Sequence, residues 1–119
     1  MSSDQNKKNL MELLDGLGSG RLMEVFDKFY ADDVVMMENN EPDPNRVGKA
    51  KNRAYEQYFA DNAQWHGAKL GPVLADGEFT AYEMWMDLTF MGQRMQRTQF
   101  AVQTWKDGKI VKEVFYYKG

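Results

Sequence analysis

Residues 78–117 read EFTAYEMWMDLTFMGQRMQRTQFAVQTWKDGKIVKEVFYY, and this stretch decides the fold. It holds three runs rich in β-branched and aromatic residues, separated by short turns at Gly92 and at Asp107-Gly108. Such runs with tight glycine turns between them predict antiparallel strands joined by hairpins. The predicted strands are Glu78–Phe90, Arg94–Trp105 and Ile110–Tyr117.

The strand pattern extends upstream to Gln64, and Asp76-Gly77 forms a further turn. Before that point, apolar residues follow helical spacing. We expect a first helix through Leu10–Leu17, ended by glycines, and a second that is capped by Ser19 and ended by Asp32-Asp33. The pattern then predicts a short strand at Val34–Met37 and a third helix at Arg46–Asp61 that buries Val47, Ala50, Ala54, Tyr55, Tyr58 and Phe59.

Helices followed by a run of hairpins are typical of an α+β fold, with the helices packed on one face of an antiparallel sheet. The length of 119 residues predicts a single domain, residues 1–119, of which residues 1–8 are polar and are expected to form a frayed end.

Composition excludes several classes of function. The absence of cysteine excludes disulfides, thiolate zinc sites and a thiol nucleophile, and it is compatible with the cytoplasm, where we expect the protein to reside. The net charge of −3 and the lack of a basic stripe argue against a nucleic-acid partner. No apolar run approaches the ~20 residues of a membrane span. No residue spacing indicates a metal or another cofactor, so we expect none.

Several segments resemble one known superfamily. They are FYADDVVMME at residues 29–38, Gly48-Lys49-Ala50 after a proline-containing loop, and WKDGKIV at residues 105–111. From about Leu10 to its end, the chain resembles the nuclear transport factor 2-like superfamily, in its SnoaL-like and ketosteroid-isomerase-like branch. The resemblance implies a cone-shaped, curved antiparallel sheet of the cystatin-like type, with three N-terminal helices on its concave face. One sheet face would line a cavity, and the other often forms a dimer contact.

The hairpins determine which strand residues share a face, because side chains alternate along a strand. A two-residue turn near Gly92 places Tyr82, Met84, Met86 and Leu88 on one face with Arg97, Gln99, Ala101 and Gln103. The last hairpin allows two registers. A two-residue turn would add Lys112, Val114 and Tyr116 to that face, whereas a three-residue loop with a bulge would add Glu113, Phe115 and Tyr117.

Resemblance to ketosteroid isomerases favours the second register. It implies a pocket for a small apolar molecule, lined by Tyr55, Tyr82, Met84, Met86, Arg97, Gln99, Ala101, Glu113, Phe115 and Tyr117. The opposite face would hold Ala81, Glu83, Trp85, Phe100, Val102, Val114 and Tyr116. Because this second set is strongly apolar, we expect a homodimer through the outer sheet face.

Glu38 is the candidate catalytic residue, because it falls where ketosteroid isomerases place their general base. A carboxylate at a pocket wall can accept a proton from carbon or water. Such a base needs a partner that stabilises the oxyanion it creates. The two matching donor positions are Leu13 and Ala101, which cannot donate, so steroid isomerisation is not expected. Replacement donors would come from Tyr55, Tyr82, Gln99 or Tyr117.

Three further polar residues are candidates. Arg97 could fix a substrate carboxylate, or it could lie at the rim and pair with surface acids. In the three-residue register it lies opposite Tyr117, while Glu113 lies opposite Ala101. His66, the one histidine of the chain, could be a cavity base or a hydrogen-bonded residue at the start of a strand.

Two classes of function fit this pattern. The first is a small-molecule-binding protein of unknown substrate that acts as a lyase, isomerase or cyclase on an apolar carbonyl compound, with Glu38 as general base. The second is a non-catalytic module that binds a ligand or dimerises. The resemblance does not choose between them, since this fold supports many enzymes and many domains without activity.

Overall fold

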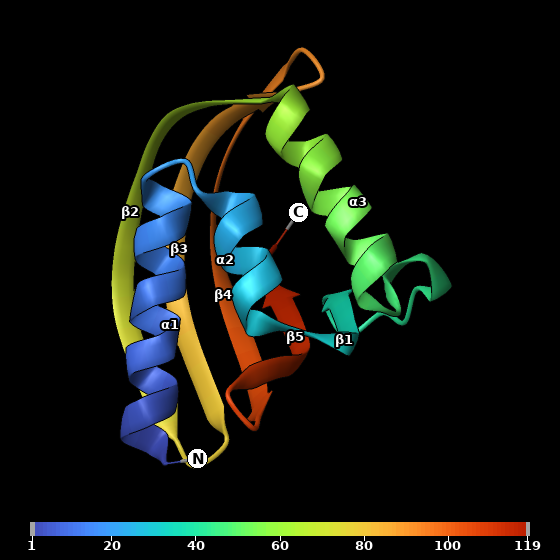
Figure 1. The fold of residues 1–119 in the computed structure, drawn as a ribbon. Helices are drawn as coiled ribbons and strands as arrows, with labels where there is room; N and C mark the ends of the chain where they lie inside the picture. Colours follow the sequence, from blue (N-terminus) through green and yellow to red (C-terminus); the bar gives the residue numbers. More distant parts are fainter. Residues whose placement is uncertain (1, 119) are drawn as a thin grey trace.

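The computed structural model describes residues 2–118 and has the α+β architecture expected from the sequence. Its elements are α1 (Ser3–Gly18), α2 (Leu22–Phe29), β1 (Tyr30–Glu38), η1 (Pro44–Arg46), α3 (Lys49–Asn62), β2 (Ala63–Asp76), β3 (Phe79–Phe90), β4 (Gln93–Lys106) and β5 (Lys109–Tyr116). The five strands form one curved sheet in the order β1-β5-β4-β3-β2, with the helices on one side of it (Figure 1). Three of the strand pairs are antiparallel, but β1 runs parallel to β5.

The core lies where α1 and α2 cover the concave side of the sheet. Leu10 and Leu13 of α1 and Phe26 of α2 are at most 1% exposed. Phe26 stacks on Tyr30, and Phe29 meets Trp105 edge to face. Burial of these large apolar side chains is the main stabilising contribution to the fold.

Residues 3–8 belong to α1, within the segment 1–8 for which we expected a frayed end; residue 1 lies outside the described residues. α1 begins at Ser3, with Ser2 as its N-cap. The Nδ2 of Asn6 donates to the Gly77 carbonyl over 3.1 Å, and the Gly77 amide donates to the Ser3 hydroxyl over 2.8 Å. The first turn of α1 is therefore fastened to the β2–β3 turn, an interaction between residues far apart in the sequence.

Helix ends also differ from the sequence prediction. Ser19 is not the cap of the second helix but the C-cap of α1, where its hydroxyl donates to the Asp15 carbonyl. α2 ends at Phe29, and Asp32 and Asp33 lie within β1. Pairing with β5 begins at Tyr30, so the helix ends before the two aspartates that the sequence analysis took as its end.

The third helix completely buries a polar residue, where the prediction placed apolar residues. Asn52 is the fully buried residue of α3, whereas Val47, Tyr55 and Tyr58 are substantially exposed. Ala50 and Ala54 are exposed as well. Tyr58 and Phe59 do contact Phe90 of β3, but the residue that α3 buries completely packs against a polar group, described below.

The β3–β4 hairpin has the expected register. Met91 and Gly92 form a two-residue turn with φ of 53° and 81°, the mirror-image turn that suits twisted strands. Tyr82 pairs with Ala101 and Met84 with Gln99, so these residues share the face that the helices cover.

The β4–β5 hairpin combines features of both expected registers. Its turn, Asp107-Gly108, has two residues, but Val111 is then left out of the ladder as a bulge. The bulge turns Glu113 and Phe115 to the helix side, as the three-residue register predicted. The pairing is two residues further along than expected, since Glu113 lies opposite Gln103 and Phe115 opposite Ala101.

Within residues 2–118, none of the helices combines the length and the apolar composition that a membrane-spanning segment needs.

Close packing of α1 against α2 can be tested at Gly16. A Cβ atom added there would lie 2.2 Å from Val25 Cγ1, whereas one added at Gly18 would meet nothing within 4 Å. We expect Gly16→Ala to lower the free energy of unfolding by about 1–3 kcal/mol through overpacking. Gly18→Ala is the matched control and should be neutral or slightly stabilising, because alanine favours helix. Urea unfolding of both variants measures this, and equal stability of the two would contradict the close contact.

Candidate functional site

Arg46 is the residue around which the polar side chains of the concave side gather. It ends η1, a short turn that Asp43 caps by accepting the Asn45 amide. Its side chain is only 5% exposed. A buried guanidinium is costly unless its charge and its donors find partners.

Asn52 of α3 supplies the first set of partners. Its Oδ1 accepts Arg46 Nε over 2.7 Å, and its Nδ2 donates to the carbonyls of Arg46 and Gly48 over 2.8 and 2.9 Å. Gly48, with φ of 95°, starts the helix and donates its amide to Val34 of β1. These bonds fix η1, α3 and β1 to one another and so determine where the guanidinium lies.

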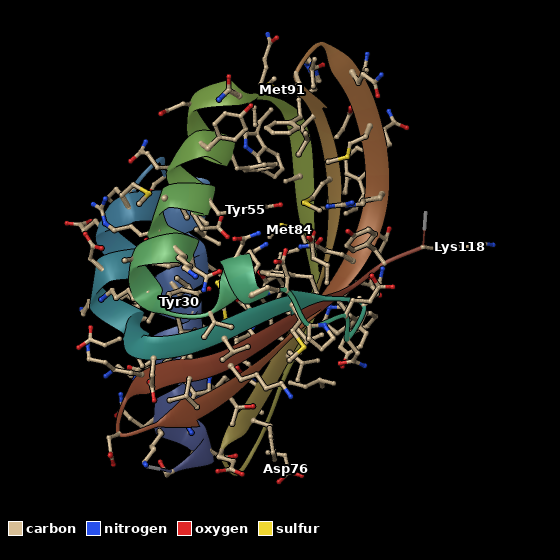
Figure 2. All side chains as sticks on the ribbon, turned by 90° about the vertical axis from the view of Figure 1, so that its right-hand side faces the viewer. Tyr30, Tyr55, Asp76, Met84, Met91 and Lys118 are labelled. Atoms are coloured by element: carbon tan, nitrogen blue, oxygen red, sulfur yellow. The ribbon has the colours of Figure 1, made fainter. Side chains whose placement is uncertain are left out.

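Two carboxylates face the two ends of the guanidinium. Arg46 Nη1 lies 3.8 Å from Oε2 of Glu38, at the end of β1, and Nη2 lies 3.5 Å from Oε1 of Glu56, on α3. The Arg46 guanidinium also stacks over the Tyr55 ring, with its carbon 3.8 Å from the ring centroid. Tyr55 of α3 and Met84 of β3 both lie between this helix and the sheet (Figure 2). We call Arg46, Glu38 and Glu56 the arginine–carboxylate cluster.

A second cation and a phenol border the cluster. The Tyr117 hydroxyl donates to Glu38 Oε1 over 3.0 Å, and Asn39 holds the Tyr117 amide through its side-chain oxygen. The Arg97 guanidinium stacks over the Tyr117 ring at 3.8 Å. Arg97 Nε is buried without a hydrogen-bond partner among the described residues.

A separate chain of hydrogen bonds crosses the inner part of the sheet. Trp105 donates to Thr80, Thr80 to Gln103, and Gln103 to Oε2 of Glu113, over 2.8, 2.8 and 2.7 Å. The Tyr30 hydroxyl donates to the other oxygen of Glu113. Glu113 is 1% exposed. Both of its oxygens therefore have donors, which is the condition for burying a carboxyl group.

Burial and charge set the protonation of the site. Burial raises the pKa of Glu56 from 4.5 to about 7, against the lowering effect of Arg46 and with help from Glu113 and Glu38. Burial also raises the pKa of Glu113, although its hydrogen bonds from Tyr30 and Gln103 oppose this. Burial and the neighbouring Glu38 raise the pKa of Tyr55 and Tyr117, so these phenols keep their protons near neutral pH.

Open space lies beside Glu38. A pocket of about 210 Å³ is lined by Glu38 and Arg46 together with Met37, Glu41, Pro42 and Asp43. Further inside, Tyr82 and Met86 are buried, and Met84 and Phe115 pack against or beside the core. The inner part of the predicted wall is thus filled, whereas Glu38 and Arg46 border open space at the end of β1, which we call the rim. Tyr55, Glu56 and Tyr117 are not among the residues that line this pocket.

The predicted site residues fall into two groups, one at the rim and one on the inner sheet face. Glu38, Tyr55, Tyr117 and Arg97 meet at the rim. Tyr82, Met84, Met86, Gln99, Glu113 and Phe115 lie on the inner sheet face. His66 does not join either group: it bonds the Thr89 hydroxyl over 2.7 Å and lies near Asp87, on the outer face.

The sequence reading missed Arg46 and Glu56. Arg46 was taken as the first residue of a helix, which gives it no special role. Glu56 follows Asn52 by four residues, so the two lie on one side of α3, and this polar pair is the signal that could have found them. Within residues 2–118, no group of three or more histidine or acidic side chains is arranged to hold a metal ion.

The curved sheet with three covering helices defines a protein of the nuclear transport factor 2-like fold. The chain belongs to the SnoaL-like domain family, whose match spans residues 6–117. A comparison with curated protein sequences finds no match.

Solved structures of the same fold include proteins with different assigned activities. A candidate SnoaL-like polyketide cyclase from Mesorhizobium loti is 28% identical, with a TM-score of 0.81 over 98% of this chain and 100% of the other. An LEH-like epoxide hydrolase from M. tuberculosis is 17% identical, with a TM-score of 0.80 over 98% and 84%. A candidate ketosteroid isomerase from Kribbella flavida is 21% identical, with a TM-score of 0.75 over 98% and 80%.

The raised pKa of Glu56 predicts a dependence of stability on pH. Its folded pKa of about 7 lies above the unfolded value of 4.5, so the folded state holds this proton more tightly. The contribution of Glu56 to the free energy of unfolding is complete below pH 4.5 and is lost as pH rises through about 7. The free energy of unfolding falls by about 3 kcal/mol over this range, because each unit of difference between the folded and unfolded pKa corresponds to ~1.4 kcal/mol.

Glu56→Gln should reduce this dependence, because glutamine keeps the neutral shape without titrating. Urea unfolding at a series of pH values measures it. The buried Glu113 contributes a loss of the same sign in both proteins, so the difference between wild type and variant isolates Glu56. Identical pH profiles would show that Glu56 titrates normally.

Proposed function

We propose that the protein is an acid–base enzyme of the lyase, isomerase or cyclase type, acting on a small apolar carbonyl compound, with Glu38 as the general base. The observation that carries this proposal is the position of Glu38, whose carboxylate lies beside an open pocket and contacts both Tyr117 and Arg46. A base, a phenolic donor and a fixed cation at one rim are the parts that proton abstraction next to a carbonyl needs.

The geometry suggests how these parts would act. A substrate carbonyl entering the pocket would take the place of Glu38 as acceptor for the Tyr117 hydroxyl. Glu38 would then be free to remove a proton from the neighbouring carbon. Negative charge developing on the carbonyl oxygen would be stabilised by the phenol and by the Arg46 guanidinium, which is already oriented by Asn52.

Proton abstraction can be tested without knowledge of the natural substrate. We expect the protein to accelerate exchange of the acidic C–H protons of β-tetralone, a bicyclic ketone, in deuterium oxide, measured by NMR. Glu38→Gln should slow this exchange at least a hundredfold, since general bases contribute roughly 10²–10⁴.

Glu78→Gln is the matched control, because Glu78 is an exposed glutamate at the β2–β3 turn, away from the pocket. It should leave the exchange unchanged. If Glu38→Gln exchanges β-tetralone as fast as wild type, Glu38 is not the base.

A second candidate function, dimerisation, is supported by the outer sheet face. Phe100 and Tyr116 pair across β4 and β5 and are 40% and 37% exposed, and Leu74 on β2 is 60% exposed. The Glu83 and Phe100 pair adjoins them on the same face. An exposed apolar band of this kind is typical of a surface that meets a second copy.

Phe100→Lys tests this proposal, because the lysine would lie opposite Glu83 and should be tolerated by the fold. We expect sedimentation to give a dimer for wild type and a monomer for the variant. Met11→Lys, which changes an exposed methionine on α1, is the control and should remain dimeric. A monomeric wild-type protein would rule out the dimer.

A further inference from the structure

We propose that Asn39 and Arg97 are positioning residues of the candidate site, and that together they hold the Tyr117 phenol against Glu38. Their role rests on the proposed function, because any effect on a reaction would pass through Glu38, the proposed base. Neither Asn39 nor Arg97 is among the residues that line the pocket, so neither needs to contact a substrate. Arg97 then has a role other than the two that the sequence suggested.

Tyr117 lies beyond the end of the sheet. β5 ends at Tyr116, which pairs with Phe100 of β4, and Tyr117 follows outside the strands. Lys118, the next residue, extends away from the molecule (Figure 2). The Tyr117 hydroxyl nevertheless donates to Glu38 Oε1 over 3.0 Å, so contacts other than strand pairing must keep this residue in place.

Asn39 supplies the first of these contacts. Its amide donates to the Phe115 carbonyl over 2.7 Å, and its side-chain Oδ1 accepts the Tyr117 amide over 2.9 Å. In a parallel ladder a residue donates its amide to the partner strand and accepts, through its own carbonyl, an amide further along that strand. Here the Asn39 side chain takes the place of that carbonyl. Asn39 therefore continues the pairing of β1 with β5 by one residue and anchors the backbone of Tyr117.

The conformation of Asn39 belongs to a tight turn. Asn39 and Asn40 have φ of 54° and 61°, and Glu38 and Glu41 pair on either side of them. This is the mirror-image two-residue turn, in which asparagine is favoured because it tolerates positive φ. The neighbouring Asn40 makes a different bond, since its Oδ1 accepts the Tyr116 hydroxyl over 2.9 Å. The two asparagines thus share one conformation but hold two different residues.

Arg97 holds the Tyr117 ring from the side of the sheet. It lies opposite Met86 in the β3–β4 ladder, and its guanidinium carbon is 3.8 Å from the centroid of the Tyr117 ring. Among the described residues this ring is the partner found for the guanidinium, and Arg97 Nε is buried without a hydrogen-bond partner. Burial and Glu38 raise the pKa of Tyr117, whereas Arg97 lowers it. The cation over the ring therefore makes the phenol a better donor to Glu38.

The position of Tyr117 determines the orientation of the Glu38 carboxylate. Oε1 of Glu38 accepts the Tyr117 hydroxyl at 3.0 Å, while Oε2 lies 3.8 Å from Arg46 Nη1. The Glu38 side chain is 37% exposed, so without Tyr117 it would keep only the longer contact and could turn away from its place beside the pocket. A general base works only within hydrogen-bond reach of the proton that it removes, so such a turn slows the reaction.

Hydrogen exchange of the Tyr117 backbone amide, followed by NMR, tests the role of Asn39 without a substrate. We expect Asn39→Gly to speed this exchange roughly fivefold, because glycine keeps the positive φ but removes the acceptor. Asn39→Asp retains an acceptor oxygen and should keep the wild-type rate. Asn40→Gly makes the same change at the neighbouring positive φ and is the matched control, which should leave the Tyr117 amide unaffected. Equal rates in Asn39→Gly and wild type would overturn the role of Asn39.

Titration of the Tyr117 phenol, followed through isotope-labelled ring carbons, tests the role of Arg97. Tyr117→Phe assigns the signal. Arg97→Met should move the midpoint toward higher pH, because it removes the charge that lowers the pKa of Tyr117, and Arg97→Lys should move it less. Lys7→Met, which removes an exposed charge of α1, is the control and should leave the midpoint in place. A midpoint unaffected by Arg97→Met would show that Arg97 does not act on Tyr117.

Exchange of β-tetralone then tests whether the two residues act through Glu38. Asn39→Gly and Arg97→Met should each lower the maximal exchange rate about tenfold, with little change in the half-saturating concentration, because neither residue lines the pocket. Asn39→Asp should restore most of the rate, and Asn40→Gly should leave it unchanged. Wild-type rates in both Asn39→Gly and Arg97→Met would contradict the positioning of Glu38 through Tyr117.

The two kinds of measurement fail independently. If wild type exchanges no β-tetralone, the proposed function loses its support with this class of compound, while amide exchange and the phenol titration still decide whether Asn39 and Arg97 hold Tyr117. If Glu38→Gln abolishes β-tetralone exchange and Asn39→Gly does not slow it, the base is retained and the positioning role is rejected.

Discussion

The burial of the Arg46 guanidinium is the constraint on which the polar half of this structure depends. A cation with a 5% exposed side chain requires partners from every direction. Here they come from α3, through Asn52, Tyr55 and Glu56, and from β1, through Glu38. The same residues hold the third helix against the first strand. The fold and the site therefore share one set of interactions, and a change that weakens the cluster weakens the attachment of α3.

The two ends of the concave side differ in how their side chains are packed and paired. Where α1 and α2 cover the sheet, apolar side chains fill the space, and the polar chain from Trp105 to Tyr30 is satisfied by its own members. Beside α3 the ion pairs are longer, since Arg46 meets its acids at 3.5 and 3.8 Å, and Glu38 is partly exposed although Arg46 is buried. Loose ion pairs near open space can exchange partners with a bound molecule, whereas the satisfied inner chain cannot do so without leaving donors unpaired.

The strands could be predicted from sequence because tight turns and period-two alternation are local signals. Met91-Gly92 and Asp107-Gly108 mark both hairpins, and the resulting face of Tyr82, Met84 and Gln99 is the one that the structure has. The candidate site was harder to predict from the sequence than the strands were. Glu38, Tyr117 and Arg97 were predicted and lie near one another, whereas Arg46 and Glu56 were not predicted, because they are brought together by a contact between η1 and α3. The apolar pattern also predicted buried tyrosines on α3 that are substantially exposed, since the residue that this helix buries is Asn52, which binds a charged side chain.

The bulge at Val111 has a consequence for what stabilises the last hairpin. If Val111 joined the ladder opposite Thr104, the next residue, Lys112, would take the inner position opposite Gln103 that Glu113 now occupies. The turn at Asp107-Gly108 is compatible with both pairings, so the turn alone does not determine the register. Only the bulged pairing gives the Tyr30 hydroxyl a carboxylate, and Tyr30 arrives with β1. The final register of the last hairpin is therefore stabilised by a residue from the first third of the chain as well as by the hairpin's own Gln103–Glu113 hydrogen bond.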